Sequence, residues 1–255
     1  MNDNRKLYIS NGIIKHHQWT RTSIASILLL ISIMIAFVSS PYAAQAAQAE
    51  SAYRGTDTSL SALAVKKGFS DVPVEHWAYE TIHALASQGI INGVSEGKFE
   101  PDTATSRAAF SVMLARALKL KPTGTSPFRD VLPGEWHAEA ITALSEIGLI
   151  EGTAPNYFSP DRAITREEVA ALIVRAAEYK TGSTLTMGNG LGQFYDWMEV
   201  SDWAINTLNK AILAGLIKGT SAVKIQPQLH SNRAQTAQFI QHLLTFLQGP
   251  EASNS

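Results

Sequence analysis

Residues 128–177 read FRDVLPGEWHAEAITALSEIGLIEGTAPNYFSPDRAITREEVAALIVRAA, and this stretch decides the fold because the chain contains two more copies of it. The other copies begin at Phe69 and Phe194. All three share a Phe-x-Asp start, a tryptophan, two glycines four residues apart, a proline, and an arginine six residues after the proline. Repetition of this kind is typical of small structural units that stack on one another.

The apolar spacing within each copy predicts two helices joined by a loop. The first helix of the first copy carries one stripe, made of Ile82, Leu85, Ala86 and Ile90. Gly89 stands near its end, where a left-handed cap favours glycine. The second helix has a similar stripe, made of Phe110, Met113, Leu114, Ala117 and Leu118. Because six such helices cannot bury their stripes singly, we predict an all-α fold in which the units pack on one another.

A capping residue followed by an arginine marks the start of each second helix. The capping residues are Ser106, Thr165 and Asn232. Thr165 and Glu168 have the spacing of a capping box, and Asn232 and Gln235 are arranged similarly. The first residue inside each helix is therefore an arginine, namely Arg107, Arg166 and Arg233.

An arginine at a helix start suits an anionic ligand. A helix N-terminus offers unpaired N–H groups and a partial positive charge. The guanidinium group adds a flat fork that matches a carboxylate with two parallel hydrogen bonds. The alternative is a structural arginine, either solvated or paired with a nearby aspartate, and the sequence leaves both interpretations open.

These landmarks resemble the S-layer homology domain of bacterial surface proteins, most closely in the tetrapeptide Ile164-Thr165-Arg166-Glu167. The resemblance covers residues 69 to 247. It implies three helix-loop-helix repeats that form a pseudo-threefold spindle around a central three-helix bundle, with the first helices in that bundle. The predicted repeats are 69–120, 128–180 and 194–248, with a linker at 181–193.

The resemblance also implies a ligand, a pyruvylated secondary cell wall polysaccharide attached to peptidoglycan and held in grooves between the repeats. The pyruvyl carboxylate is expected on Arg107, Arg166 and Arg233. Trp77, Trp136 and Trp203 are further polysaccharide-binding candidates, because sugar rings stack on aromatic faces, although we expect them to lie mainly in the core with partial exposure in the grooves. The supporting residues are Ser106, Thr165, Asn232, Gly93, Gly152 and Gly219.

The third copy departs furthest from the family pattern. It reads His230-Ser231-Asn232-Arg233-Ala234, and Gln228 replaces an aspartate of the other two copies. We expect it to complete the fold while contributing a weaker groove, or none. Asp71, Asp130 and Asp196 are expected to be structural, as caps or in ordering the turn before the first helix.

The predicted function is non-covalent anchoring to the wall of a Gram-positive-type cell, with S-layer proteins as further partners. The protein is expected to be secreted and associated with the cell wall or S-layer. The alternative is a secreted helical module for protein–protein interaction, or a structural S-layer module, that binds no sugar.

The first residues have the pattern of a secretory signal. Basic residues precede an apolar run at 24–38, and small residues follow it. We predict a signal peptide at 1–46, cleaved after residue 46 or 49, and no membrane contact thereafter. The alternative is an uncleaved anchor, but the run is shorter than the roughly 20 residues of a spanning helix. Residues 47–68 are expected to be a flexible lead-in and 249–255 a tail.

Composition argues against several other functions. The formal net charge of −1 is not the basic footprint of a nucleic-acid-binding protein. The absence of cysteine excludes disulfides and thiolate chemistry. No metal-binding histidine pair, phosphate-binding loop or nucleophile elbow occurs, so we expect neither a cofactor nor a metal, and no enzymatic activity.

Overall fold

A computed structural model describes residues 68–249. The predicted signal peptide, residues 47–67 of the lead-in and residues 250–255 of the tail lie outside this range. Across 68–249 the regular structure is helical, with isolated β-bridges and no β-strand, which confirms the all-α prediction. The α-helices are α3 (Tyr79–Ser87), α4 (Arg107–Ala117), α5 (Ala138–Glu146), α6 (Arg166–Thr181), α7 (Ile205–Leu213) and α8 (Arg233–Gln248). The 3₁₀ turns are η1 (Leu191–Gln193), η2 (Trp197–Glu199) and η3 (Asp202–Ala204).

The helix ends follow the predicted signals. The side chains of Ser106, Thr165 and Asn232 each accept a hydrogen bond from the N–H group three residues on. Complete capping boxes begin α6 and α8. The glycine after each first helix has a φ near 70°, a conformation that costs glycine little.

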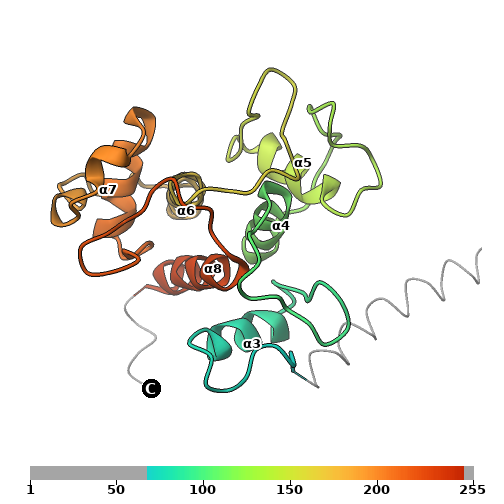
Figure 1. Cartoon of the computed structure of the whole chain (residues 1–255). Helices are drawn as coiled ribbons and strands as arrows, with labels where there is room; N and C mark the ends of the chain where they lie inside the picture. The colour runs from blue at the N-terminus through green and yellow to red at the C-terminus, as the bar shows by residue number, and fades with distance from the viewer. Residues whose placement is uncertain (1–67, 250–255) are drawn as a thin grey trace, which may run out of the picture. The chain divides into compact units, whose positions relative to one another are not determined.

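The second helices form the centre of the described part of the chain, and α8 packs against both α4 and α6 (Figure 1). The expectation that the first helices make the central bundle is therefore wrong. The reason lies in the apolar surface of each helix. α4 buries nearly all of its residues, whereas α3 buries only Ile82, Leu85 and Ala86. A helix that is apolar on most sides belongs in the middle, and one with a single stripe belongs outside.

Each first helix packs on the second helix of another unit. α5 of the second unit covers α4 of the first, α7 of the third unit covers α6 of the second, and α3 of the first unit covers α8 of the third. The pairing closes into a ring, so all three units are needed to bury one continuous core.

A closed triangle of backbone hydrogen bonds joins the three units just before the second helices. The N–H of Thr105 donates to the carbonyl of Ser231 at 2.9 Å, Ser231 donates to Ile164 at 3.0 Å, and Ile164 donates to Thr105 at 2.9 Å. The three residues hold equivalent places in the three copies. This triangle fixes the helix-start arginines at equivalent positions around a pseudo-threefold axis.

The predicted linker 181–193 is partly built into the fold. Residue 181 is the last of α6, and Leu191 is buried. The N–H of Leu191 donates to Oδ1 of Asn209 on α7 at 2.9 Å. The end of this segment therefore packs onto the third unit.

Candidate functional site

The three helix-start arginines are buried, and each binds the loop of the next unit around the ring. Their exposed fractions are 7% for Arg107, 3% for Arg166 and 8% for Arg233. In each, Nε and Nη2 donate to two backbone carbonyls of that loop. The accepting residues are Phe158 and Glu151 for Arg107, Ile225 and Lys218 for Arg166, and Phe99 and Asn92 for Arg233, at 2.7–3.1 Å. The arginines therefore hold the units together, whatever else they bind.

An aromatic ring lies against each guanidinium group. Arg107 lies 4.5 Å from the ring centroid of Phe158, and Arg233 lies 4.5 Å from that of Phe99. The third copy has isoleucine at the equivalent loop position, and Phe239 of α8 supplies the ring for Arg166 instead, at 5.2 Å. A cation–π contact with a desolvated arginine contributes roughly 1–2 kcal/mol.

The N–H groups at the helix starts are already occupied. At α6, the N–H groups of Arg166 and Glu167 donate to the carbonyls of Leu229 and Pro227 at 3.0 Å, and that of Glu168 donates to the Thr165 side chain. α4 and α8 begin in the same way. The hypothesis that these N–H groups bind a ligand anion is therefore wrong, because the loops of neighbouring units already use them.

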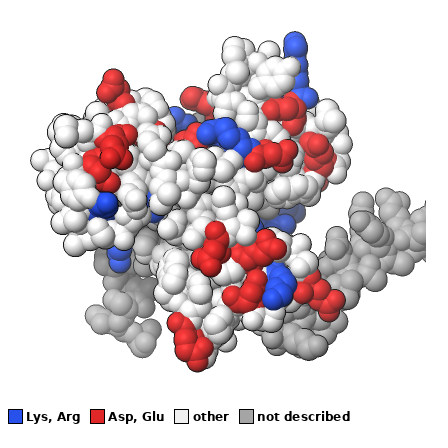
Figure 2. All heavy atoms as spheres, viewed as in Figure 1, with Lys and Arg blue, Asp and Glu red and all other residues white. Residues whose placement is uncertain are grey.

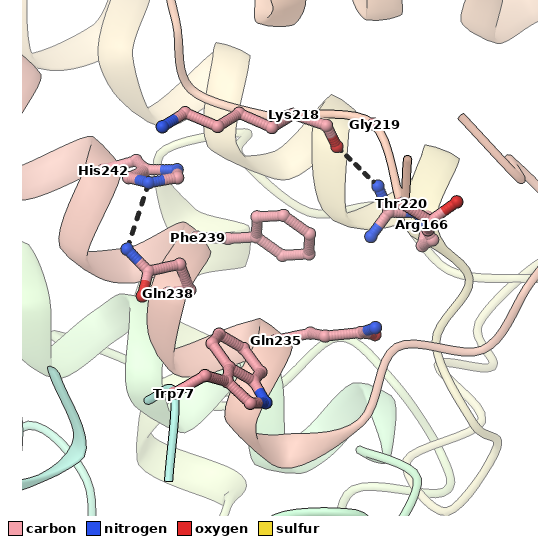
Figure 3. A pocket seen from close by; sticks show the side chains of 9 residues that line it. All are labelled: Trp77, Arg166, Lys218, Gly219, Thr220, Gln235, Gln238, Phe239 and His242. Carbon is pink, nitrogen blue, oxygen red and sulfur yellow. Dashed lines mark hydrogen bonds between the residues drawn. The ribbon is translucent and has the colours of Figure 1, made fainter. Parts of the chain in front are cut away.

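One groove brings residues of all three units together around Arg166 (Figure 3). Its volume is about 380 Å³. Trp77 comes from the turn before α3, Arg166 from α6, and the other residues from the third unit. These are Lys218, Gly219, Thr220, Gln235, Gln238, Phe239 and His242. We call this set the Arg166 groove.

The Arg166 groove is positively charged. Two cations and no carboxylate occur among its nine lining residues. Burial lowers the pKa of Arg166 to about 10, against the opposing influence of Asp196, so the guanidinium stays charged at neutral pH. Elsewhere on the surface, Figure 2 shows basic side chains scattered among acidic ones on the face in view. The groove is thus a local concentration of positive charge.

The tryptophans lie at the surface, contrary to the expectation that they pack mainly in the core. Trp77 is 61% exposed, Trp136 66% and Trp203 55%. Of these, Trp77 lines the Arg166 groove. Trp136 lines a second cavity of about 540 Å³ formed by its own unit. That cavity carries three carboxylates, of Asp130, Glu135 and Asp161, and therefore suits an acidic ligand poorly.

The three grooves implied by the repeats are not equivalent. Nη1 of Arg107 lies 3.7 Å from a carboxylate oxygen of Glu168, which also pairs with Arg162. The equivalent of Glu168 is Gln235 on α8 and Ala109 on α4. Arg107 therefore already has an internal counter-ion, whereas no carboxylate of residues 68–249 lies within 4.0 Å of Arg166.

The predicted supporting residues shape the loops. A Cβ atom added at Gly93, Gly152 or Gly219 would stand 2.4–2.5 Å from a backbone carbonyl, so only glycine fits. Both carboxylate oxygens of Asp71 and Asp130 accept N–H bonds from the loop 28 and 29 residues later. Asp196 does the same in the third unit, where its partners are the N–H groups of Ile225 and Gln226. These aspartates order the loop that the arginines grip.

Sequence reasoning did not identify the third-unit residues of the Arg166 groove, nor Glu168 as the partner of Arg107. Lys218, Gln238 and His242 carry no motif of their own. A comparison of equivalent positions would have singled out His242, because the other units have Arg116 and Arg175 there. Within 68–249, no cluster of three or more histidine, aspartate or glutamate side chains is placed to hold a metal ion.

Comparison with known proteins shows a family resemblance in the first two units. The sequence model of the family described as "S-layer homology domain" matches residues 68–111 and 127–170. These two segments are therefore similar to S-layer homology domains. The predicted third S-layer homology repeat, 194–248, lies outside both matches.

Relatives that share this region include enzymes and S-layer proteins. The chain is 35% identical over 185 residues to an amylopullulanase of Thermoanaerobacterium thermosulfurigenes, covering 72% of this chain and 10% of that protein. It is 34% identical over 178 residues to an S-layer protein of Bacillus thuringiensis subsp. finitimus, and 33% identical over 178 residues to the S-layer protein sap of Bacillus anthracis. Each of these two alignments covers 69% of this chain and 21% of the relative. The chain therefore spans only a tenth to a fifth of the length of these relatives.

The match to the S-layer homology domain model and the S-layer relatives indicate association with the cell surface. In the described range, no helix combines the length and the apolar character needed to cross a membrane.

Proposed function

We propose that this protein anchors itself non-covalently to the cell wall by binding an acidic polysaccharide. The proposed ligand is a pyruvylated secondary cell wall polysaccharide attached to peptidoglycan, and the proposed role is binding rather than catalysis. One observation carries the proposal: the Arg166 groove unites two cations, an exposed tryptophan and no carboxylate. Such a groove attracts a carboxylate and offers a face to a sugar ring.

Each part of the groove has a distinct role in this proposal. Nε and Nη2 of Arg166 each donate one hydrogen bond to a loop carbonyl. The remaining N–H donors of the guanidinium group, together with its charge, are available to the ligand carboxylate. Lys218 adds a second charge. The ring of Trp77 stacks on the sugar, and Gln235 supplies an amide for its hydroxyl groups. All three units contribute, so the site exists only in the folded array.

We propose that the third unit is also an S-layer homology repeat. It has the same two helices, the same cap at Asn232 and the same Asp196 contacts with its loop. Arg233 grips the first unit as Arg107 grips the second. The 178-residue alignments with S-layer proteins are also longer than the two matched segments together.

We further propose that the grooves differ in strength, in an order that sequence divergence did not suggest. Arg107 is weakened as an anion site by Glu168. The third unit, although divergent, supplies most of the Arg166 groove. We therefore expect the Arg166 groove to bind an anion more strongly than the site at Arg107.

A second candidate function is a structural or protein–protein interaction module, with S-layer proteins as partners. The burial of all three guanidinium groups favours this function, because the arginines already hold the fold together. A chain of this kind would keep its fold and its partners when wall saccharides are removed.

Co-sedimentation with purified wall sacculi separates the two functions. We expect the chain to sediment with intact sacculi and to remain in solution after pyruvyl groups are removed. Trp77→Ala should lower the affinity for sacculi, measured by co-sedimentation, about tenfold. This corresponds to about 1.4 kcal/mol for one lost stacking contact. Tyr179→Ala, which removes an exposed aromatic side chain outside the groove, is the matched control. Equal sedimentation before and after pyruvyl removal would rule out the carboxylate mechanism and favour the second function.

A further inference from the structure

The Arg166 groove contains a histidine where the other two units have arginine. Arg116 on α4, Arg175 on α6 and His242 on α8 each stand nine residues after the helix-start arginine. Arginine is permanently charged, whereas the charge of histidine changes near neutral pH. The groove on α8 is thus the one of the three in which this position can titrate.

The hydrogen-bond partners of His242 define the protonation state of its ring. Nδ1 lies 3.2 Å from the carbonyl oxygen of Leu216, which can only accept, so Nδ1 carries a proton. Nε2 lies 3.1 Å from the amide nitrogen of Gln238, which can only donate, so Nε2 accepts. With these partners the imidazole ring is neutral.

The same network can also accommodate a charged ring. Oε1 of Gln238 accepts from the hydroxyl group of Thr81 on α3 at 3.0 Å. If the amide of Gln238 turned over, its oxygen would accept from a protonated Nε2 and its nitrogen would donate to the Thr81 hydroxyl group. Both charge states of His242 therefore keep the ring contacts with Leu216 and Gln238, and Gln238 keeps a hydrogen bond with Thr81.

Desolvation and nearby positive charge oppose protonation of the His242 ring. The charged groups that line the groove with His242 are Lys218 and Arg166. α3 contributes Thr81 to the network, Trp77 lies just before α3, and α4 contributes no residue to the groove lining. Burial and Lys218 lower the pKa of His242 below its usual value, against the opposing carbonyl of Leu216. A ligand carboxylate would supply the counter-charge that the groove lacks.

We propose that His242 makes this groove acid-responsive: its protonation adds a cation beside Arg166 and Lys218 and strengthens the binding of an acidic saccharide. This inference rests on the proposed function of the groove. The direction of the pH dependence follows from the linkage between proton binding and ligand binding. A bound anion favours the protonated ring, so binding takes up a proton and affinity rises as pH falls. One linked proton changes affinity by at most about tenfold per pH unit.

The test is calorimetric titration of the full chain with fragments of pyruvylated wall polysaccharide between pH 5 and 8. The ligand carboxylate stays ionised throughout, because such groups titrate at about pH 3–4. For the native chain we expect affinity to rise roughly three- to tenfold from pH 8 to pH 5. His242→Gln cannot gain the charge, so at every pH it should bind with the affinity that the native chain has at pH 8. His242→Arg copies the residue of the other units and is always charged, so at every pH it should bind about as strongly as the native chain does at pH 5.

The outcomes separate this inference from the proposed function. Failure of the native chain to bind at any pH would overturn both. If Trp77→Ala weakened binding as expected but the native chain and His242→Gln had the same pH profile, only the role of His242 would be overturned. The remaining histidines are unchanged in these variants, so their contributions cancel. NMR titration of the His242 ring in the native chain gives an independent readout, and its pKa should rise when the saccharide is added.

Discussion

At the scale of single residues, Arg166 joins two units and also lines a groove. Its Nε and Nη2 donors bind backbone carbonyls of a neighbouring unit, and its charge faces the groove. Sequence reasoning identified all three arginines from their recurrence. It could not identify their partners, because these are backbone carbonyls, which every residue has whatever its type. Contact between Glu168 and Arg107 was also hidden, since Glu168 was already accounted for by the capping box.

The substitution Glu168→Gln should create a stronger anion site at Arg107. It removes a negative charge 3.7 Å from Nη1, and Gln235 shows that glutamine completes the same capping box. We expect some loss of stability, because Arg107 and Arg162 lose a charged partner, and a several-fold gain in affinity for pyruvylated polysaccharide, measured by calorimetry. Glu139→Gln makes the same change in net charge at an exposed position of α5. An affinity equal to that of the native chain would show that Glu168 does not block Arg107.

At the scale of helices, periodicity predicted the six helices, and capping residues predicted the starts of α4, α6 and α8 correctly. They did not predict which helices lie at the centre. An apolar stripe shows which face of a helix is buried but does not identify its partner. The denser apolar surface of the second helices was visible in the sequence, for example in the run from Val169 to Ala177, and would have indicated their central place.

The junction between α8 and the first unit should depend on the shape of the arginine as well as its charge. In Arg233→Lys one ammonium group replaces a fork that reaches the carbonyls of Phe99 and Asn92. At least one buried carbonyl would lose its partner, at a cost of about 1–3 kcal/mol. We expect urea unfolding, followed by circular dichroism, to show this loss.

Arg129→Ala serves as the control for that substitution, because Arg129 is exposed and its side chain takes part in no such bridge. Its effect should stay within about 0.5 kcal/mol. Equal stability of Arg233→Lys and the native chain would mean that the guanidinium bridge does not hold the units together.

At the scale of the whole described array, acid should loosen the loops. Burial acts to raise the pKa values of Asp71 and Asp130, but N–H bonds from their loops outweigh it and hold those pKa values below the usual range. A depressed pKa in the folded state gives stability that is present above about pH 4 and is lost as pH falls through the folded value. We therefore expect the melting temperature to fall below about pH 4. Asp130→Asn should melt lower at neutral pH and show a smaller acid-induced fall. A fall equal to that of the native chain would contradict this role for Asp130.

The closed ring of units explains why the sequence alone could not define the Arg166 groove. The residues of the Arg166 groove are drawn from positions 77 to 242 and come together only when α3 packs on α8. Repeat analysis treats each unit separately, so it assigned one arginine and one tryptophan to each unit. In the structure, Trp77 of the first unit shares a groove with Arg166 of the second and with α8 of the third.

The most direct test is a crystal structure of the protein soaked with a pyruvylated saccharide from the wall polysaccharide. We predict the sugar ring on the face of Trp77 and the pyruvyl carboxylate within hydrogen-bonding distance of Arg166 or Lys218. An empty Arg166 groove at a saccharide concentration that saturates binding in solution would contradict the account.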